Sequence, residues 1–297
     1  MSELLNDFLK EKRILIAGAG TTGSEILKYF IFYEQLDLTI LDFDTVMLSD
    51  LNRQFFFRES DIGRRKVAVI SEYFLKFYNK KIKVIDKNLF DCEIEEFDLI
   101  FCCFDNIESR MELNIRISGT KCILIDIGIE NLNAHVKKVI FEKTSCLFCI
   151  KDLYKQDKFR NICSLKGSQK REDQIYALLQ KFESISNQEI ARKRNTQDVI
   201  PENLKVFNEI QKSEIIIRET IDAFNTSNKK KTDEFEVIGI KDNIIANTCF
   251  IASIATAFAI AIIFDNENDF WFYNGANTPY ITKTKIQKDH KCFICNK

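Results

Sequence analysis

The first half of the chain alternates short apolar runs with helical patterns. RILIA (13–17) breaks into a glycine-rich turn, and the helical sequence SEILKYFIF follows it. Further apolar runs of strand length are LDLTILD, IKVID (82–86), DLIFCCF (98–104) and CILIDIG (122–128), and helical patterns occupy 62–78 and 107–118. Strands that alternate with helices predict a doubly wound, mainly parallel sheet, so the expected fold class is α/β.

The pattern changes between residues 164 and 234. The sequence there becomes charged and helical, as in EDQIYALLQKFESI, and the sheet-like pattern resumes afterwards. We therefore expect the first part of a sheet domain at 1–162, an inserted helical domain at 163–235, and the second part of the sheet domain at 236–297.

One apolar segment, TCFIASIATAFAIAIIF (248–264), has two interpretations. Its length is at the short limit of a membrane-spanning helix. Small and large side chains alternate along it, which suits a helix buried against a sheet. We prefer the buried helix and keep the membrane span as the alternative.

Composition excludes several classes of protein. A chain of 297 residues with 45% hydrophobic content can bury a large core, which excludes a disordered tail. Charge is nearly balanced, with 43 Lys and Arg against 44 Asp and Glu, so nothing calls for nucleic acid or a membrane surface. The N-terminus lacks a secretion signal, which predicts the nucleus or cytoplasm. In such a reducing compartment the 10 cysteines serve as thiols, metal ligands or nucleophiles.

The glycine-rich turn is a candidate phosphate site. Gly18, Gly20 and Gly23 allow backbone N–H groups to approach a pyrophosphate at a helix N-terminus. Asp42, about 20 residues further on, would accept hydrogen bonds from a ribose. This pattern alone fits a nicotinamide oxidoreductase equally well, and a tight turn without a ligand is a further alternative.

Segment 41–70 is more specific. It contains Asp42 and Asp44, the triplet Asn52-Arg53-Gln54, and Gly63 to Lys66. In these motifs the chain resembles ThiF-type adenylyltransferases and the activating enzymes of ubiquitin-like proteins. The resemblance implies a Rossmann-like adenylation domain in which Asp42 holds the ribose of ATP and Asn52, Arg53 and Lys66 hold its phosphates. A nicotinamide enzyme has no use for this Arg and Lys pair, whereas attack at a phosphorus atom needs fixed cations.

The sequence FDLIFCCFDNIESR matches a second motif of this family. The resemblance places a magnesium-binding carboxylate at Asp105, although Asp105 could also cap the helix after it. Asp50 stands where the family usually has Asn. An acid there weakens phosphate affinity or takes another role, so Asp50 is left out of the expected site. The expected nucleotide site comprises Gly18, Gly20, Gly23, Asp42, Asp44, Asn52, Arg53, Gln54, Lys66, Asp105, Asn106 and Arg110.

Two cysteine pairs, Cys146 with Cys149 and Cys292 with Cys295, have the spacing of zinc ligands. Together they predict a closed, structural zinc site of four thiolates that joins the chain end to its middle. His135 and His290 lack comparable partners and are expected at the surface or in packing. The other cysteines outside the insertion lie in or beside apolar runs and are expected to be core residues: Cys92, Cys102, Cys103, Cys122 and Cys249.

Cys163 lies in FRNICSLKG, where the expected insertion begins. The family's attacking cysteine occupies a similar place, so the resemblance implies that Cys163 captures an adenylated protein as a thioester. Arg160 and Lys166 would favour its thiolate. The proline of the family motif is missing here, and an idle loop thiol is the alternative.

The expected function is ATP-dependent activation of a ubiquitin-like protein. The chain most resembles the catalytic subunit of the heterodimeric SUMO-activating enzyme, with the neddylation-activating subunit as a close competitor. No arginine precedes Arg13, so a partner subunit is expected to supply one to the ATP site. A conjugating enzyme is expected to receive the activated protein. The family's C-terminal ubiquitin-fold domain is expected to be absent. An inactive binding module and a nicotinamide oxidoreductase are the competing hypotheses.

Overall fold

The computed structural model describes residues 2–33, 36–94, 97–130, 132–154, 249–275 and 278–295. All of them belong to one compact unit formed by 1–157 and 247–297. The expected boundaries at 163 and 235 lie outside the described residues.

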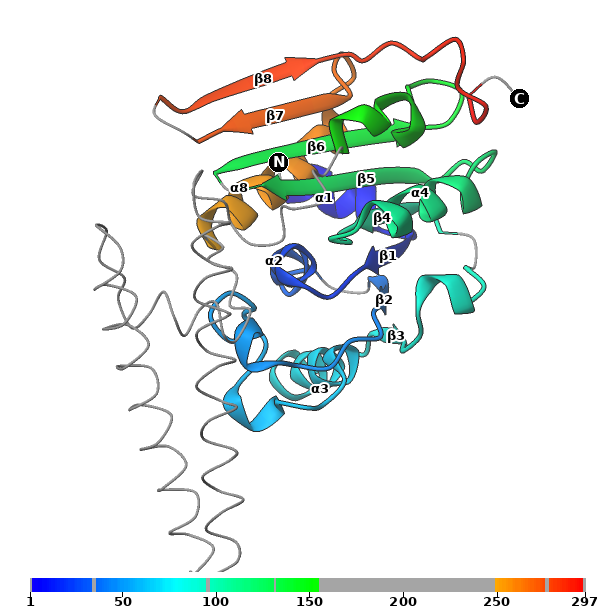
Figure 1. Ribbon diagram of the computed structural model, residues 1–297. Coiled ribbons are helices and arrows are strands. Elements are labelled where there is room, and N and C mark those ends of the chain that lie inside the picture. The colour runs from blue at the N-terminus through cyan, green and yellow to red at the C-terminus, as the bar shows by residue number, and fades with distance from the viewer. Residues whose placement is uncertain are drawn as a thin grey trace, which may run out of the picture. The chain divides into compact units, whose positions relative to one another are not determined.

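A single eight-stranded sheet organises the described part of the chain (Figure 1). Its order is β3-β2-β1-β4-β5-β6-β7-β8, from the bottom to the top of the figure. The strands are β1 (Arg13–Ala17), β2 (Asp37–Leu41), β3 (Lys83–Ile85), β4 (Leu99–Cys102), β5 (Ile123–Glu130), β6 (Asn133–Ile140), β7 (Phe270–Asn274) and β8 (Tyr280–Thr284).

The sheet has a parallel half and an antiparallel half. Strands β3, β2, β1, β4 and β5 pair in parallel, as the alternating pattern predicted. Strands β6, β7 and β8 then continue the sheet with antiparallel pairs. The prediction of a mainly parallel sheet therefore described one half and missed the other.

Helices cover both faces of the sheet, which confirms the doubly wound arrangement. One face packs against α1 (Ser2–Leu9), α2 (Thr21–Phe30), α3 (Lys66–Tyr78) and α8 (Cys249–Ala261), with the short turn η5 (Ile262–Phe264). The other face packs against α4 (Ile107–Arg116) and the 3₁₀ segment η4 (Leu147–Tyr154). Three further 3₁₀ turns connect elements: η1 (Leu48–Asp50), η2 (Glu59–Asp61) and η3 (Leu89–Asp91).

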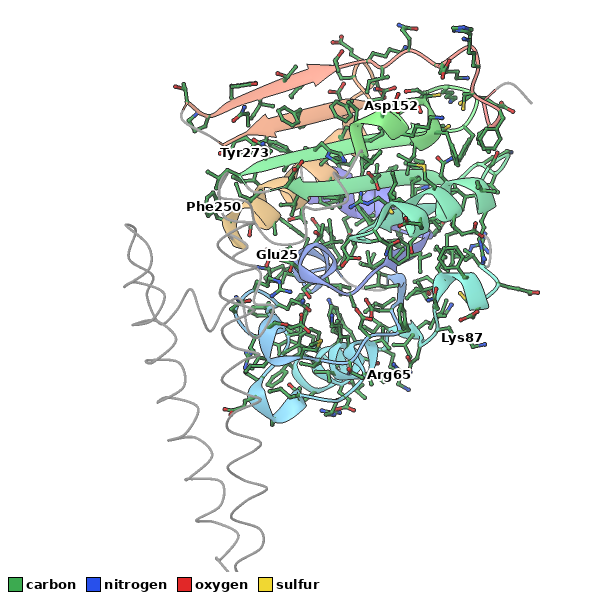
Figure 2. All side chains as sticks on the ribbon, viewed as in Figure 1. Glu25, Arg65, Lys87, Asp152, Phe250 and Tyr273 are labelled. Carbon is green, nitrogen blue, oxygen red and sulfur yellow. The ribbon has the colours of Figure 1, made fainter. Side chains whose placement is uncertain are left out.

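Residues 249–264 of the apolar segment form the helix α8 and the turn η5. Ile251, Ala252, Ala255 and Ala259 of α8 are fully buried in the core. Glu25 of α2, labelled in Figure 2, accepts a hydrogen bond from the Ser253 hydroxyl of α8 at 2.8 Å. None of the helices in the described ranges is long and apolar enough to cross a membrane.

Candidate functional site

The first βα turn leaves a helix N-terminus open. Gly18 has φ +102°, which favours glycine, and its N–H donates to the Leu41 carbonyl at 2.8 Å. A Cβ atom at Gly23 would lie 2.0 Å from the Gly18 carbonyl oxygen, so α2 packs too closely for any side chain there. Gly20 precedes α2 with nothing within 4 Å of its Cβ position and no side chain capping the helix. The first N–H groups of α2 are therefore available to an anion.

Asp42 ties this turn to the end of β2. Its carboxylate accepts the Ala19 N–H at 2.6 Å and the Asp44 N–H at 2.7 Å. Burial raises the pKa of Asp42, and the two N–H donors work against this shift. A carboxylate has about four acceptor positions, so Asp42 retains capacity for ribose hydroxyls beside the phosphate turn.

Lys66 begins α3 and is almost fully buried. Its Nζ lies 3.5 Å from Asp44 Oδ2 and 3.4 Å from Asp50 Oδ2. Its own N–H donates to the Asp44 carbonyl, which holds the helix start beside the loop after β2. The expected helix at 62–78 begins only here, since Gly63 with φ +85° lies in the preceding turn.

Arg53 and Gln54 contact Asp50, the same acid that pairs with Lys66. Arg53 Nη2 is 3.4 Å from Asp50 Oδ1, and Gln54 Nε2 donates to the same oxygen at 2.7 Å. Arg53 also donates to the Ser49 carbonyl and to Asn52 Oδ1. Gln54 Oε1 is buried and has no hydrogen-bond partner among the described residues. The chain thus gathers two predicted phosphate-binding cations at the end of the sheet where Asp42 lies.

Asp105 and Asn106 follow β4 at the same end of the sheet. Asn106 caps α4, since its Oδ1 accepts the Ser109 N–H at 2.8 Å. The alternative that Asp105 is the helix cap is therefore wrong. Asp105 is exposed, and the Asn106 side-chain amide donates to its Oδ1 at 3.3 Å. Its role as a magnesium ligand stays a prediction.

Arg110 is held inside the protein. Its guanidinium donates to Asp126 Oδ1 at 2.6 Å and to the carbonyls of Phe104 and Ile127. Asp126 also accepts the Tyr154 hydroxyl at 2.6 Å. This buried network gives Arg110 a structural role, and its predicted contact with the nucleotide is untested.

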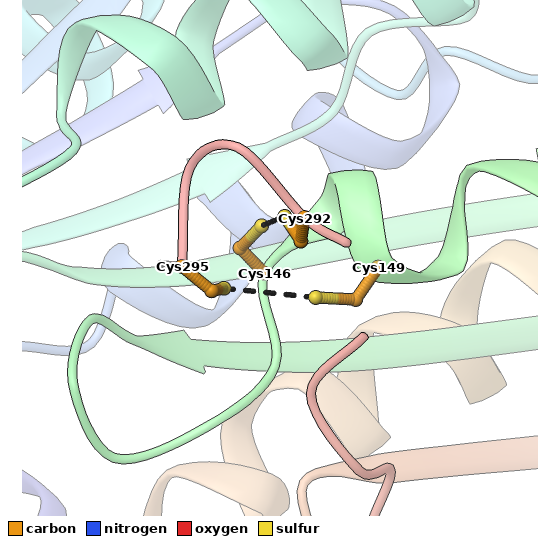
Figure 3. Close-up of side chains that lie close together, drawn as sticks. All are labelled: Cys146, Cys149, Cys292 and Cys295. Atoms are coloured by element: carbon orange, nitrogen blue, oxygen red, sulfur yellow. Dashed lines mark hydrogen bonds between the residues drawn. The ribbon is translucent and has the colours of Figure 1, made fainter. Parts of the chain in front are cut away.

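The two cysteine pairs converge, as Figure 3 shows. Cys146 Sγ lies 3.6 Å from Cys292 Sγ, and Cys149 Sγ lies 3.6 Å from Cys295 Sγ. All four sulfurs lie within 4.8 Å of one another, and all four cysteines are free of disulfides. A tetrahedral zinc ion about 2.3 Å from each sulfur holds the sulfurs about 3.8 Å apart, so the donor set fits zinc.

The surroundings of the sulfurs also suit a cation. Burial raises the pKa of the Cys146 and Cys149 thiols, and each would ionise readily only beside a positive charge. The Asp289 N–H donates to Cys149 Sγ at 3.4 Å, an interaction that favours a thiolate. These residues would hold a structural ion that closes the end of the described chain onto η4.

The other predictions have mixed outcomes. Cys163 lies outside the described residues, and so does the side chain of Cys249. Cys92, Cys102, Cys103 and Cys122 are buried as expected. His135 packs against Phe270 with ring centroids 5.9 Å apart, and His290 is exposed, so the interpretation of both histidines is confirmed.

Sequence reasoning missed Asp50 and Asp126 as organising acids. Asp50 was noticed only as a departure from a family pattern, and Asp126 sits inside an apolar strand as a single acid. A lone charge in a run of buried positions is the signal that could have identified Asp126, because such charges need partners.

Comparison with known proteins identifies relatives over the whole chain. The ThiF family profile matches residues 2–294. The NEDD8-activating enzyme E1 catalytic subunit of Schizosaccharomyces pombe is 27% identical over 318 residues, which cover 95% of this chain and 69% of that protein. The crystal structure of E. coli MccB with ATP shares the fold, with a TM-score of 0.59 and 16% sequence identity. The match covers 99% of this chain and 68% of that chain.

Two further relatives match about half of the chain. A ubiquitin-activating enzyme E1-like protein of Saccharomyces cerevisiae is 35% identical over 149 residues, 48% of this chain and 23% of that protein. SUMO-activating enzyme subunit 2 of Dictyostelium discoideum is 31% identical over 150 residues, 48% of this chain and 22% of that protein. With the match along nearly its full length, the chain belongs to the ThiF family.

Proposed function

We propose that this chain activates a ubiquitin-like protein by adenylating its C-terminus with ATP and magnesium. The observation that carries the proposal is the grouping of Arg53 and Lys66 with Asp42 beside the open N-terminus of α2, in a ThiF-family chain. Relatives whose names state activation of ubiquitin-like proteins support it further.

The chemistry of the first step is an attack by a carboxylate on ATP. A C-terminal carboxylate oxygen forms a bond to the α-phosphorus, and the bond from that phosphorus to pyrophosphate breaks. Negative charge develops on the phosphate oxygens, and Arg53, Lys66 and the N–H groups of α2 would stabilise it. Magnesium, with Asp105 as a ligand, would neutralise the departing pyrophosphate.

The second step belongs to Cys163. Its thiolate would attack the carbonyl carbon of the acyl-adenylate, forming a thioester as AMP leaves. A conjugating enzyme would then accept the protein from Cys163. The two steps use different residues, so we expect that they can be separated by substitution.

The identity of the ubiquitin-like protein has two candidates. NEDD8 is the first, because four relatives named for its activation match 95% or more of this chain. SUMO is the second, because the local motifs resemble that subunit and a SUMO-activating relative is 31% identical over 48% of the chain. We further propose a partner subunit that lends an arginine, and action in the nucleus or cytoplasm.

A structural zinc ion belongs to the same proposal. The convergence of Cys146, Cys149, Cys292 and Cys295 supports it, and the closed donor set leaves no position for water. Zinc would stabilise the fold and take no part in the chemistry.

The test is exchange of labelled pyrophosphate into ATP. The full chain with its co-purified partner subunit is incubated with ATP and each ubiquitin-like protein. We expect exchange that depends on one of these proteins and on its free C-terminal carboxylate. Exchange with none of them would exclude the proposed function.

A further inference from the structure

Asp50 lies at the centre of the predicted phosphate-binding side chains. It is 4% exposed and closes the short turn η1. Its Oδ1 accepts from Gln54 Nε2 at 2.7 Å and faces Arg53 Nη2 at 3.4 Å. Its Oδ2 accepts from the Met47 N–H at 3.0 Å and faces Lys66 Nζ at 3.4 Å. One carboxylate thus contacts both cations.

All four groups around Asp50 are hydrogen-bond donors. A carboxylate only accepts, so it satisfies all of them at once. An amide of the same shape would turn its NH₂ group toward two donors, whichever way it is flipped. This pocket therefore fits Asp and does not fit the Asn that the family resemblance leads one to expect.

Charge leads to the same conclusion. Arg53 and Lys66 have side chains that are 10% and 8% exposed, and two cations this close repel each other in a site with little water. Among the described residues, the other acid in an ion pair with Lys66 is Asp44, whose side chain is 53% exposed and therefore screened by solvent. Asp50, with a side chain that is 6% exposed, is the stronger counter-charge.

We propose that Asp50 is a positioning residue of the nucleotide site, an internal counter-ion that holds Arg53 and Lys66 together before ATP arrives. The inference rests on the proposed function, since it assigns these two cations to the phosphates. Asp50 acts through them and does not contact the nucleotide. Its negative charge repels phosphate at longer range, but the loss of two positioned cations outweighs that repulsion.

The experiment measures the Kd of the full chain, with its co-purified partner subunit, for MgATP by titration calorimetry, without any acceptor protein. Asp50→Asn should raise the Kd about tenfold. The variants Asp50→Glu and Asp50→Gln have side chains of equal length and different charge. The Asp50→Glu protein should bind ATP more tightly than the Asp50→Gln protein. In a Lys66→Met background, the effect of Asp50→Asn should fall to threefold or less, because one of the two cations it positions is gone.

Asp61 provides the matched control. Its carboxylate closes η2 by accepting the Arg58 N–H at 2.9 Å and pairs with Arg64 at 2.9 Å, which repeats the arrangement of Asp50 away from the predicted phosphate cations. Asp61→Asn should leave the Kd within twofold of the wild-type value.

The outcomes separate the two proposals. Equal or tighter ATP binding by Asp50→Asn, equal binding by the Glu and Gln variants, or an undiminished effect in the Lys66→Met background would overturn the positioning role. A wild-type chain that binds ATP but shows no exchange with any ubiquitin-like protein would contradict the proposed function alone. A wild-type chain that binds no ATP would overturn both.

Discussion

Arg110 Nη1 lies 2.6 Å from Asp126 Oδ1, and both side chains are buried between α4 and β5. Burial alone would raise the pKa of Asp126, but the Arg110 guanidinium, with His135 and Tyr154, holds that pKa well below its usual range. Because α4 begins directly after Asp105 and Asn106, this ion pair fixes the helix that presents the predicted magnesium ligand.

Asp126→Asn is expected to destabilise the fold by about 3–5 kcal/mol at neutral pH, because it leaves Arg110 as an uncompensated buried charge. Because folding lowers the pKa of Asp126, its negative charge stabilises the fold at any pH above the pKa that Asp126 has in the unfolded chain. This stabilisation is lost as the pH falls through the lower pKa of the folded protein. The difference in the free energy of unfolding between the wild type and the variant should therefore be constant near pH 7 and should become smaller below about pH 4.

Thermal unfolding followed by circular dichroism at several pH values checks this prediction. Asp37→Asn, which breaks the exposed pair with Lys83, is the control and should unfold like the wild type. An Asp126→Asn chain with a wild-type midpoint at pH 7 would show that the buried pair does not stabilise the fold.

Two glycines of the first turn should respond differently to alanine. Gly23→Ala places a Cβ 2.0 Å from the Gly18 carbonyl oxygen and should lower both stability and ATP affinity. Gly20→Ala meets no protein atom within 4 Å, so its melting temperature should match the wild type while its ATP affinity falls. If Gly20→Ala and Gly23→Ala changed the ATP affinity and the melting temperature to the same extent, the open space at Gly20 would be excluded as the phosphate position.

Lys66→Ala should reduce pyrophosphate exchange at least about 100-fold, as expected when a fixed group that stabilises developing charge is removed. Asp105→Ala should do the same through loss of the metal. Lys83→Ala removes an exposed lysine of β3 and serves as the control for Lys66. Wild-type exchange in either the Lys66 or the Asp105 variant would contradict the residue assignment.

Metal analysis should find about one zinc atom per chain. Cys292→Ser should lose this zinc and lower the melting temperature, and chelation of the wild-type chain should have the same effect. Cys122→Ser changes a buried cysteine outside the cluster and should retain the metal. A chain that is fully folded without metal, with all four cluster thiols reactive, would exclude the site.

The parallel half of the fold could be predicted because its strands are short apolar runs between helical patterns. The antiparallel half could not, and β6 shows why. Its sequence NAHVKKVI carries adjacent lysines that suggest exposure, yet Lys137 and Lys138 are buried. Lys137 pairs with Asp269 at 2.9 Å, a partner 132 positions further along the chain that local pattern does not reveal.

The candidate site was predictable to a similar extent. Spacing predicted that the cysteine pairs converge, because a metal site needs ligands at fixed separations. The resemblance pointed to Arg53 and Lys66, which both contact Asp50 in the structure. The alternative that Asp105 caps α4 named the wrong residue, since Asp105 and Asn106 are both good caps and only geometry separates them. The role of Asp50 depends on four donors that converge in space, and no sequence pattern records that convergence.

The most direct test of the account is a non-reducing gel of the chain and its partner subunit after incubation with MgATP and a ubiquitin-like protein. The wild type should form an adduct that disappears with reductant. Cys163→Ala should form none, yet it should exchange pyrophosphate like the wild type, because adenylation does not use the thiol. A Cys163→Ala chain that still forms the reducible adduct would contradict the account.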